Sequence, residues 1–188
     1  MLVQDLLRTG DVLFIRIANP LYARVAAMCG SWESHVGLVL PDGRGGWRVA
    51  ESTIPLSRYT TVERFLARSE QGRFAVLRPV KALGAGEEQA LQRAAQRRMG
   101  RLYHLGFKLR SARQFCSKFV HECYLEATGI ALGRAQRFRE IFAERPTTPL
   151  RFWKWWFFGR IPWDRETLTT TSLLHSPHLS CIYDASHG

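Results

Sequence analysis

The sequence predicts an α+β protein in which a sheet of largely adjacent strands carries helices packed on it. Three observations support this class. Short apolar runs rich in valine, isoleucine and phenylalanine indicate strands. Two of these runs flank a glycine-rich turn, as in a β-hairpin. Between the strands, stretches with apolar residues at every third or fourth position indicate helices.

The expected strands are short and bounded by turn residues. They are DVLFIRI (11–17), HVGLVL (35–40), WRVAES (47–52) and RFAVLRPV (73–80). The second and third are separated only by PDGRGG, so we expect them to pair as a hairpin.

Four helices are expected, and most have recognisable ends. They cover residues 21–29, a segment starting near residue 60, 87–99 and 115–128. Asn19 and Pro20 are a typical N-cap and first residue for the first helix, which Gly30 would close. Thr60 and Glu63 have the spacing of a capping box before the second helix.

The composition favours one globular domain that spans residues 1–188, with 46% apolar residues. The formal net charge of +11 suggests an anionic partner, such as nucleic acid, phospholipid or an acidic substrate. The basic residues are scattered, however, and no RRM, KH, homeodomain or zinc-finger signature accompanies them, so we do not expect nucleic-acid binding. The N-terminal segment resembles neither a signal peptide nor a membrane span, and four cysteines are too few for a disulfide framework. We therefore expect a cytoplasmic protein.

The segment RQFCSKFVHECY (113–124) allows three interpretations: a zinc site, a buried helix or a nucleophile. Cys116 and Cys123 are seven residues apart, which on a helix separates them by roughly 10 Å along the axis, too far to share one ion. We expect no metal site and interpret Cys123 as a core residue. Cys116 lies in the first helical turn, where unpaired N–H groups favour a thiolate and can bind an oxyanion. Ser111 and Gln114 could cap the same end.

A thiol nucleophile needs a base, and the base needs an orienting group. His35 begins an apolar strand, where histidine is unusual unless it is hydrogen-bonded or functional. If Val39 pairs with Trp47 in the hairpin, His35 lies opposite Glu51 with their Cβ atoms about 5 Å apart. A slip by one residue would put the two on opposite faces, and the loop allows either register. A core histidine and a solvent-exposed carboxylate remain open alternatives.

Several motifs occur in an order that resembles a known family. They are GDVLFIR (10–16), SHVGLVL (34–40), VAES (49–52), YHLGFK (103–108), FCSKFV (115–120) and FWKWWFFGRIPWDRETLT (152–169). The chain resembles the permuted papain-like branch of the NlpC-type cysteine hydrolases, in particular the YiiX/YebB-like group and its YebB branch. Histidine, then carboxylate, then cysteine is the permuted order of the active-site residues.

The resemblance implies a circularly permuted papain-like α+β fold with a mainly antiparallel sheet. It implies Cys116 as nucleophile, His35 as general base and Glu51 as the group that orients it. The backbone N–H of Cys116 would bind the oxyanion, and Tyr103 and Ser117 would line the substrate site. No cofactor is implied. The chemistry would be acyl transfer to the thiol, followed by release to water or an amine.

The implied substrate is an amide or ester, such as a lipid acyl group or a cell-wall peptide fragment. A non-catalytic module that binds a lipid or peptide on the same fold is the alternative. The aromatic-rich element LRFWKWWFFGRIPW (150–163) has three basic residues and is too short to span a bilayer. It is interpreted either as a packed C-terminal element or as a lid, an acyl-binding wall or a peripheral contact with an anionic membrane surface.

Overall fold

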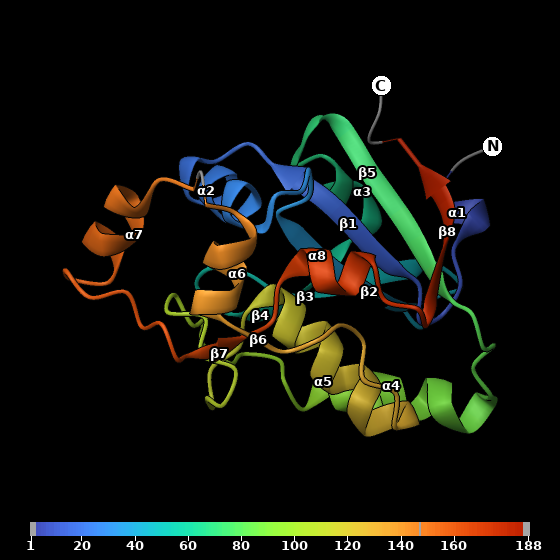
Figure 1. Ribbon diagram of the computed structural model, residues 1–188. Helices are drawn as coiled ribbons and strands as arrows, with labels where there is room; N and C mark the ends of the chain where they lie inside the picture. Colours follow the sequence, from blue (N-terminus) through green and yellow to red (C-terminus); the bar gives the residue numbers. More distant parts are fainter. Residues whose placement is uncertain (1–2, 147, 186–188) are drawn as a thin grey trace.

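An antiparallel sheet forms the centre of the computed structural model, which describes residues 3–146 and 148–185 (Figure 1). Its strand order is β4-β3-β2-β1-β5-β8. These strands are β1 (Val12–Ile17), β2 (His35–Pro41), β3 (Trp47–Ser52), β4 (Ser57–Thr61), β5 (Ser69–Pro79) and β8 (Leu179–Asp184). A separate small ladder joins β6 (Gln136–Arg137) to β7 (Glu166–Thr167).

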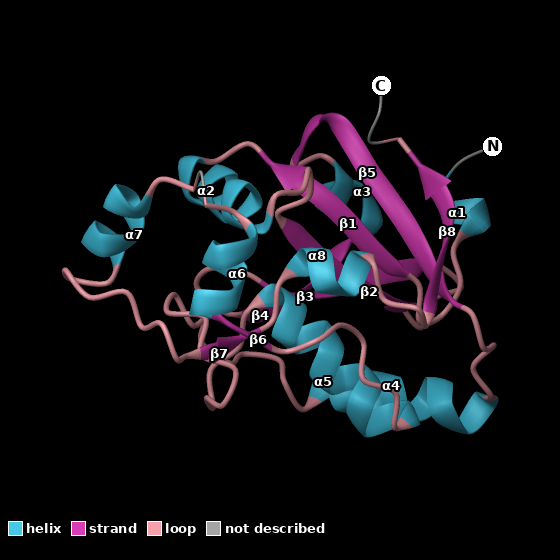
Figure 2. Cartoon of the chain, viewed as in Figure 1, coloured by secondary structure: helices cyan, strands magenta, loops and turns pink. Residues whose placement is uncertain are grey.

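Helices cover both faces of this sheet. They are α1 (Val3–Leu6), α2 (Pro20–Cys29), α3 (Val62–Leu66), α4 (Ala85–Gln96), α5 (Cys116–Thr128), α6 (Phe138–Glu144), α7 (Leu150–Trp156) and α8 (Thr170–Leu174). On one face α5 packs against β2 and β3, with α4 alongside it (Figure 1). The short α3 lies against β3, β4 and β5 and covers the other face. Beyond one end of the sheet lie α2, α6 and α7 (Figure 2).

Alternate residues of β1 fill two separate cores. Val12 and Phe14 belong to the larger core, which the sheet shares with α4 and α5. Leu13 and Ile15 belong to the smaller core under α3. Because successive strand side chains point to opposite faces, a strand covered on both sides needs an unbroken apolar run. The run in DVLFIRI is therefore explained by burial on both faces.

The ends of two helices follow the sequence signals. The side chain of Asn19 accepts a hydrogen bond from the backbone N–H of Leu21 at 2.9 Å, as expected for an N-cap. Gly30 closes α2 in the left-handed conformation, with φ of 64°. The helix that carries the cysteines begins at Cys116 and is closed by Gly129. These predictions are confirmed.

The expected hairpin forms, in a register two residues away from the one that would place His35 directly opposite Glu51. Val39 pairs with Val49 and not with Trp47. The loop is long enough to permit either pairing, and the sequence contains no signal that separates them. Because the shift is even, His35 and Glu51 stay on the same face of the sheet. They are now diagonal neighbours instead of direct partners.

The predicted capping box at the start of the second helix is also wrong. Thr60 belongs to β4 and pairs with Val49. The N-cap of α3 is Thr61, whose side chain accepts a hydrogen bond from the N–H of Arg64 at 3.3 Å. The residues before α3 form a sheet strand that the sequence analysis did not expect, and this strand moves the start of the helix.

The aromatic-rich element divides between core and surface. Trp153 of α7 is buried against Phe107 and Phe142, which fits the interpretation as a packed element. Trp155 and Phe158 do not fit it, because 72% and 99% of their surfaces are exposed. Within the described ranges, the chain has no helix whose length and apolar character would let it cross a membrane.

Gly37 in β2 lets the side chains of Val49 and Phe65, in the smaller core, pack closely against the backbone of this strand. A Cβ atom at this position would lie 2.4 Å from Cγ1 of Val49 and 2.8 Å from Cε2 of Phe65. We expect Gly37→Ala to lower the free energy of unfolding by about 1–3 kcal/mol, because the core must be forced apart. Urea unfolding measures this change. The control Gly86→Ala, in α4 with open space around it, should leave stability unchanged or slightly raised. Equal stability of the Gly37 variant and the parent would contradict the packing described.

Candidate active site

A histidine and a carboxylate form a buried pair where β2 begins and β3 ends. His35 and Glu51 are both completely buried, and Nε2 of the imidazole lies 2.6 Å from Oε2 of the carboxylate. The diagonal placement on neighbouring strands brings the two side chains together. The sequence analysis expected this contact from a direct pairing, and the structure reaches it through a different register.

Two arginines complete the surroundings of Glu51. Nη2 of Arg68 lies 2.6 Å from Oε2, and Nε of Arg58 lies 3.1 Å from Oε1. Burial alone would raise the pKa of the Glu51 carboxyl, but the hydrogen bond with His35 and the charge of Arg68 outweigh it and lower the pKa to about 2. Glu51 is therefore ionised and accepts hydrogen bonds only. Nε2 of His35 must then carry a proton, and in the neutral imidazole Nδ1 is the acceptor.

The imidazole of His35 is held between two aromatic rings. Phe65 lies on one side at a centroid distance of 5.6 Å, and Tyr22 meets it edge-on at 5.8 Å. Nδ1 is buried and has no partner of regular hydrogen-bond geometry among the described residues, but the thiol of Cys116 interacts with the same ring. Burial lowers the pKa of His35, yet the interactions with Cys116 and Glu51 outweigh it and raise the pKa above its usual value.

Cys116 is the first residue of α5, and its backbone is placed to bind an anion. The preceding residue, Phe115, is extended and is the N-cap, and no side chain caps this end of the helix. The first N–H groups of a helix have no intrahelical partners and can donate to groups outside the helix, and the N–H of Cys116 meets the hydroxyl of Tyr103. The thiol and these N–H donors thus come from the same turn of backbone.

The loop before Cys116 is fixed by a buried lysine instead of by a cap. Lys118 is completely buried, and its ammonium donates to the carbonyls of Ser111 and, at 2.9 Å, Arg113. Ser111 and Gln114 do not cap α5, contrary to expectation. The hydroxyl of Ser111 accepts from the N–H of Arg113, and the amide of Gln114 donates to Glu122. Both side chains stabilise the loop itself.

The structure places Tyr103 and Ser117 beside the thiol. The hydroxyl of Tyr103 interacts with both the backbone N–H and the thiol of Cys116. Burial and the neighbouring Cys116 raise the pKa of Tyr103, so the phenol keeps its proton. The hydroxyl of Ser117 donates to the carbonyl of Leu168 at 2.7 Å, which joins α5 to the segment before α8. Ser117 therefore lines the site with its hydroxyl already bonded.

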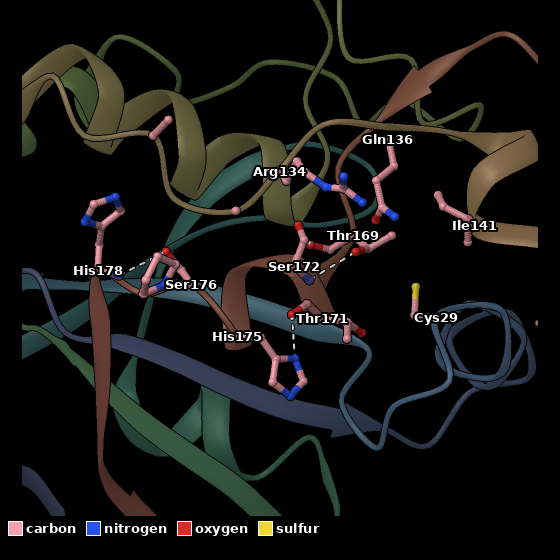
Figure 3. Close-up of a pocket in the computed structure, with 13 residues that line it drawn as sticks. Cys29, Arg134, Gln136, Ile141, Thr169, Thr171, Ser172, His175, Ser176 and His178 are labelled. Atoms are coloured by element: carbon pink, nitrogen blue, oxygen red, sulfur yellow. Dashed lines mark hydrogen bonds between the residues drawn. The ribbon is translucent and has the colours of Figure 1, made fainter. Parts of the chain in front are cut away.

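The cavity at Cys116 is small and mostly apolar. Its volume is about 30 Å³, and its walls come from α2, from Tyr103 to Phe107, from the start of α5 and from residues 167–170. This volume is enough for roughly one water molecule. A wider pocket of about 430 Å³, with a mixed polar and apolar lining, adjoins it and shares Cys29 and Thr169 as walls (Figure 3).

The sequence analysis missed four side chains of this site: Tyr22, Arg58, Phe65 and Arg68. Arg58 is the strand partner of Glu51, and β4 was not expected. Arg68 lies in the turn after α3, and Nη2 reaches the carboxylate of Glu51 at 2.6 Å. Neither arginine has a sequence signal that separates it from the many others in this chain. Tyr22 and Phe65 fit ordinary apolar helix positions.

The other cysteines have different surroundings. Cys123 is buried, as expected, and burial raises its pKa to about 12. Cys29 is also buried, which raises its pKa, whereas Cys181 is exposed. Among the residues that the structure describes, no three histidine, cysteine, aspartate or glutamate side chains gather as ligands for a metal ion.

The fold and the order of these residues define a permuted papain-like protein. The chain belongs to the family of permuted papain-like amidases, YaeF/YiiX, C92 family, whose model matches residues 6–183. It is 24% identical over 176 residues to the uncharacterized protein YiiX of Escherichia coli (strain K12), an alignment that covers 93% of this chain and 85% of that protein.

A solved structure supports the same fold. The crystal structure of YiiX from Escherichia coli O157:H7 superimposes with a TM-score of 0.86 at 24% identity, and covers 94% of this chain and 97% of that one. The resemblance to the YiiX group and the permuted fold are thereby confirmed, while the nearer likeness to YebB stays a prediction. That crystal structure is described as one of a metalloprotein. In the described part of this chain, no group of three or more such ligand side chains is found.

The ionised Glu51 makes stability depend on pH. Its pKa lies near 2 in the folded protein against an ordinary value of 4.5, so the unfolded chain takes up the proton first as the pH falls. The stabilisation is complete above about pH 4.5 and is lost towards pH 2. From about pH 5 to pH 3 we expect this group to remove about 2 kcal/mol from the free energy of unfolding.

Chemical denaturation at each pH measures this loss. Glu51→Gln should lack it, and Arg68→Gln should show a smaller one, because removing the arginine charge raises the pKa of Glu51. Asp164→Asn, which changes an exposed carboxylate, should behave like the parent protein. An equally steep loss in the Glu51 variant would show that the buried carboxylate is not its source.

Proposed function

We propose that this chain is a cysteine-dependent amidase or acyl-transfer enzyme that uses Cys116, His35 and Glu51. One observation carries the proposal: a buried imidazole is bonded through Nε2 to an ionised carboxylate and interacts with a thiol at a helix N-terminus. Such a histidine can take up the thiol proton, because the carboxylate stabilises the imidazolium that forms.

The proposed reaction has two stages. In the first, His35 takes the proton of Cys116, and Sγ attacks the carbonyl carbon of an amide or ester. The backbone N–H of Cys116 and the hydroxyl of Tyr103 donate to the resulting oxyanion. His35 then gives the proton to the departing amine or alcohol, which leaves a thioester. In the second stage, water or an amine attacks the thioester, His35 accepts its proton, and the thiol is regenerated.

The walls of the site favour an apolar acyl group. The cavity beside Cys116 is lined by Leu21, Val25, Met28 and Phe107, and its polar lining is small. The adjoining pocket, with Arg134 and several hydroxyl groups, suits the polar part of the substrate. We therefore favour a lipid-like acyl amide or ester over a cell-wall peptide fragment. At its present size the cavity cannot hold this group, so substrate enters only when a wall moves.

A chromogenic acyl ester tests the nucleophile directly. With p-nitrophenyl octanoate we expect an octanoyl adduct on Cys116, located by mass spectrometry of peptides, and release of p-nitrophenol. Cys116→Ala should abolish both, whereas Cys123→Ala, a matched change in the same helix, should leave both. Turnover by the Cys116 variant would refute the proposal. Saturable binding of octanoyl compounds without an adduct in the parent protein would favour the non-catalytic binding module.

The reactivity of the thiols tests the role of the histidine. Near neutral pH, iodoacetamide should alkylate Cys116 faster than Cys123, whose raised pKa keeps it a thiol. His35→Ala should slow alkylation of Cys116 at least about tenfold, because the proton acceptor is gone. His175→Ala, at an exposed histidine, is the control. If the rate at Cys116 is the same in both variants, His35 does not activate the thiol.

A further inference from the structure

The end of the molecule at α7 carries an unusual set of exposed side chains. In Figure 1, α7 lies at the opposite end of the molecule from β8. Exposed aromatic and basic residues meet in this helix and the turn after it: Arg151, Lys154, Trp155, Phe158 and Arg160. We refer to these five residues as the α7 patch.

The aromatic members of the patch are not part of the core, although the ring of Trp155 lies against those of Phe152 and Trp156. Phe158 is 99% exposed, and its φ of 54° lies in the left-handed region, where a phenylalanine is strained and glycine or asparagine is not. Its side chain gains no packing that offsets this strain. Trp155 is 72% exposed. The helix is anchored without these two residues, since Trp153 is buried in the core and Trp156 donates to the carbonyl of Leu105.

Among the residues that the structure describes, the basic members of the patch have no acidic partners. The sequence contains no aspartate or glutamate from Arg145 to Trp163. Within the described ranges, Arg151, Lys154 and Arg160 form no salt bridge, although the chain has many elsewhere. The patch is therefore positively charged, and the whole chain adds to that charge with a net +11. Its charge is complementary to an anionic surface.

An apolar groove lies beside the patch. It has a volume of about 780 Å³ and is formed by Leu105 and Gly106 on one side and residues 155–160 on the other, with Arg165 at its wall. The next residue, Phe107, contacts the ring of Tyr103 and lines the cavity at Cys116. The groove and the candidate active site thus share one segment of chain.

We propose that the α7 patch binds the surface of a bilayer that contains anionic phospholipids. Trp155 and Phe158 lie in the interfacial layer, where aromatic side chains are favoured, and the three basic residues contact lipid phosphates. The helix lies on the membrane and does not cross it. This inference does not rest on the thiol chemistry, because it concerns binding alone.

Sedimentation with vesicles tests the proposal. The full chain is mixed with vesicles of phosphatidylcholine that contain about 30 mol% phosphatidylserine, and with pure phosphatidylcholine vesicles. We expect binding to the first and much weaker binding to the second. High salt should weaken the binding to the anionic vesicles, because it screens the charges.

Two pairs of variants test whether vesicle binding depends on the α7 patch or only on the net charge of the chain. Lys154→Gln with Arg160→Gln should lower the partition coefficient about 25-fold, or about fivefold for each basic residue. Arg44→Gln with Arg93→Gln removes the same charge at exposed positions far from the α7 patch in sequence. This variant should change the partition coefficient little. Trp155→Ala with Phe158→Ala should also weaken binding strongly, while Val80→Ala with Leu125→Ala, at other exposed apolar residues, should not.

Three outcomes would overturn the proposal. The first is the absence of binding to anionic vesicles. The second is an equal loss in the Arg44/Arg93 variant, which would show attraction by net charge alone. The third is concentration-dependent self-association that Trp155→Ala with Phe158→Ala abolishes, without vesicle binding, since the patch would then serve a second copy of the chain. All these variants can be compared for adduct formation at Cys116, which reports separately on the proposed function.

Discussion

The structure depends on the compensation of one buried charge, the carboxylate of Glu51. Removing an ionised carboxylate from water costs several kcal/mol unless charges and hydrogen bonds replace the lost hydration. Here the replacements come from three other segments: His35 from β2, Arg58 from β4 and Arg68 from the turn after α3. The strand pairing and the end of α3 are thus joined at a single side chain. The same contacts set the tautomer of the histidine. One set of ion pairs and hydrogen bonds therefore both stabilises the fold and orients the side chains of the site.

The thiol is positioned by different means, through side chains of α5 that donate to backbone carbonyls of other segments. The buried ammonium of Lys118 holds the carbonyls of the preceding loop, and Ser117 bonds to the carbonyl of Leu168. At the middle of the helix, the hydroxyl of Tyr124 donates to the carbonyl of Gly10, at the start of the sheet. These contacts fix the first turn of α5 relative to the strands. The cysteine and histidine, 81 positions apart in sequence, therefore meet because a helix and a sheet are joined at several points.

Much of this arrangement could be predicted from local sequence. The features that could not be predicted depend on contacts between segments far apart in the chain. The strand DVLFIRI, the capped helix after Asn19 and the helix that begins at Cys116 all follow from composition and end signals. The register of the hairpin did not, because a long glycine-rich loop permits more than one pairing. The face shared by His35 and Glu51 was still correct, since side-chain alternation survives an even shift. Arg58 and Arg68 were missed because the partner of a buried charge is chosen by tertiary structure, and arginine is common throughout this chain.

The tight enclosure of Cys116 bears on how an acyl-enzyme would be resolved. The cavity of about 30 Å³ holds roughly one water molecule, and an acyl chain must displace it. In the proposed reaction, bulk solvent would then be kept away from the thioester, and its lifetime would depend on which molecule is admitted next. Hydrolysis and transfer to an amine use the same base and the same oxyanion donors. In the proposed reaction their ratio would then depend on the walls from α2 and residues 167–170 that enclose the thiol, so relatives with the same three side chains could differ in product through these walls alone.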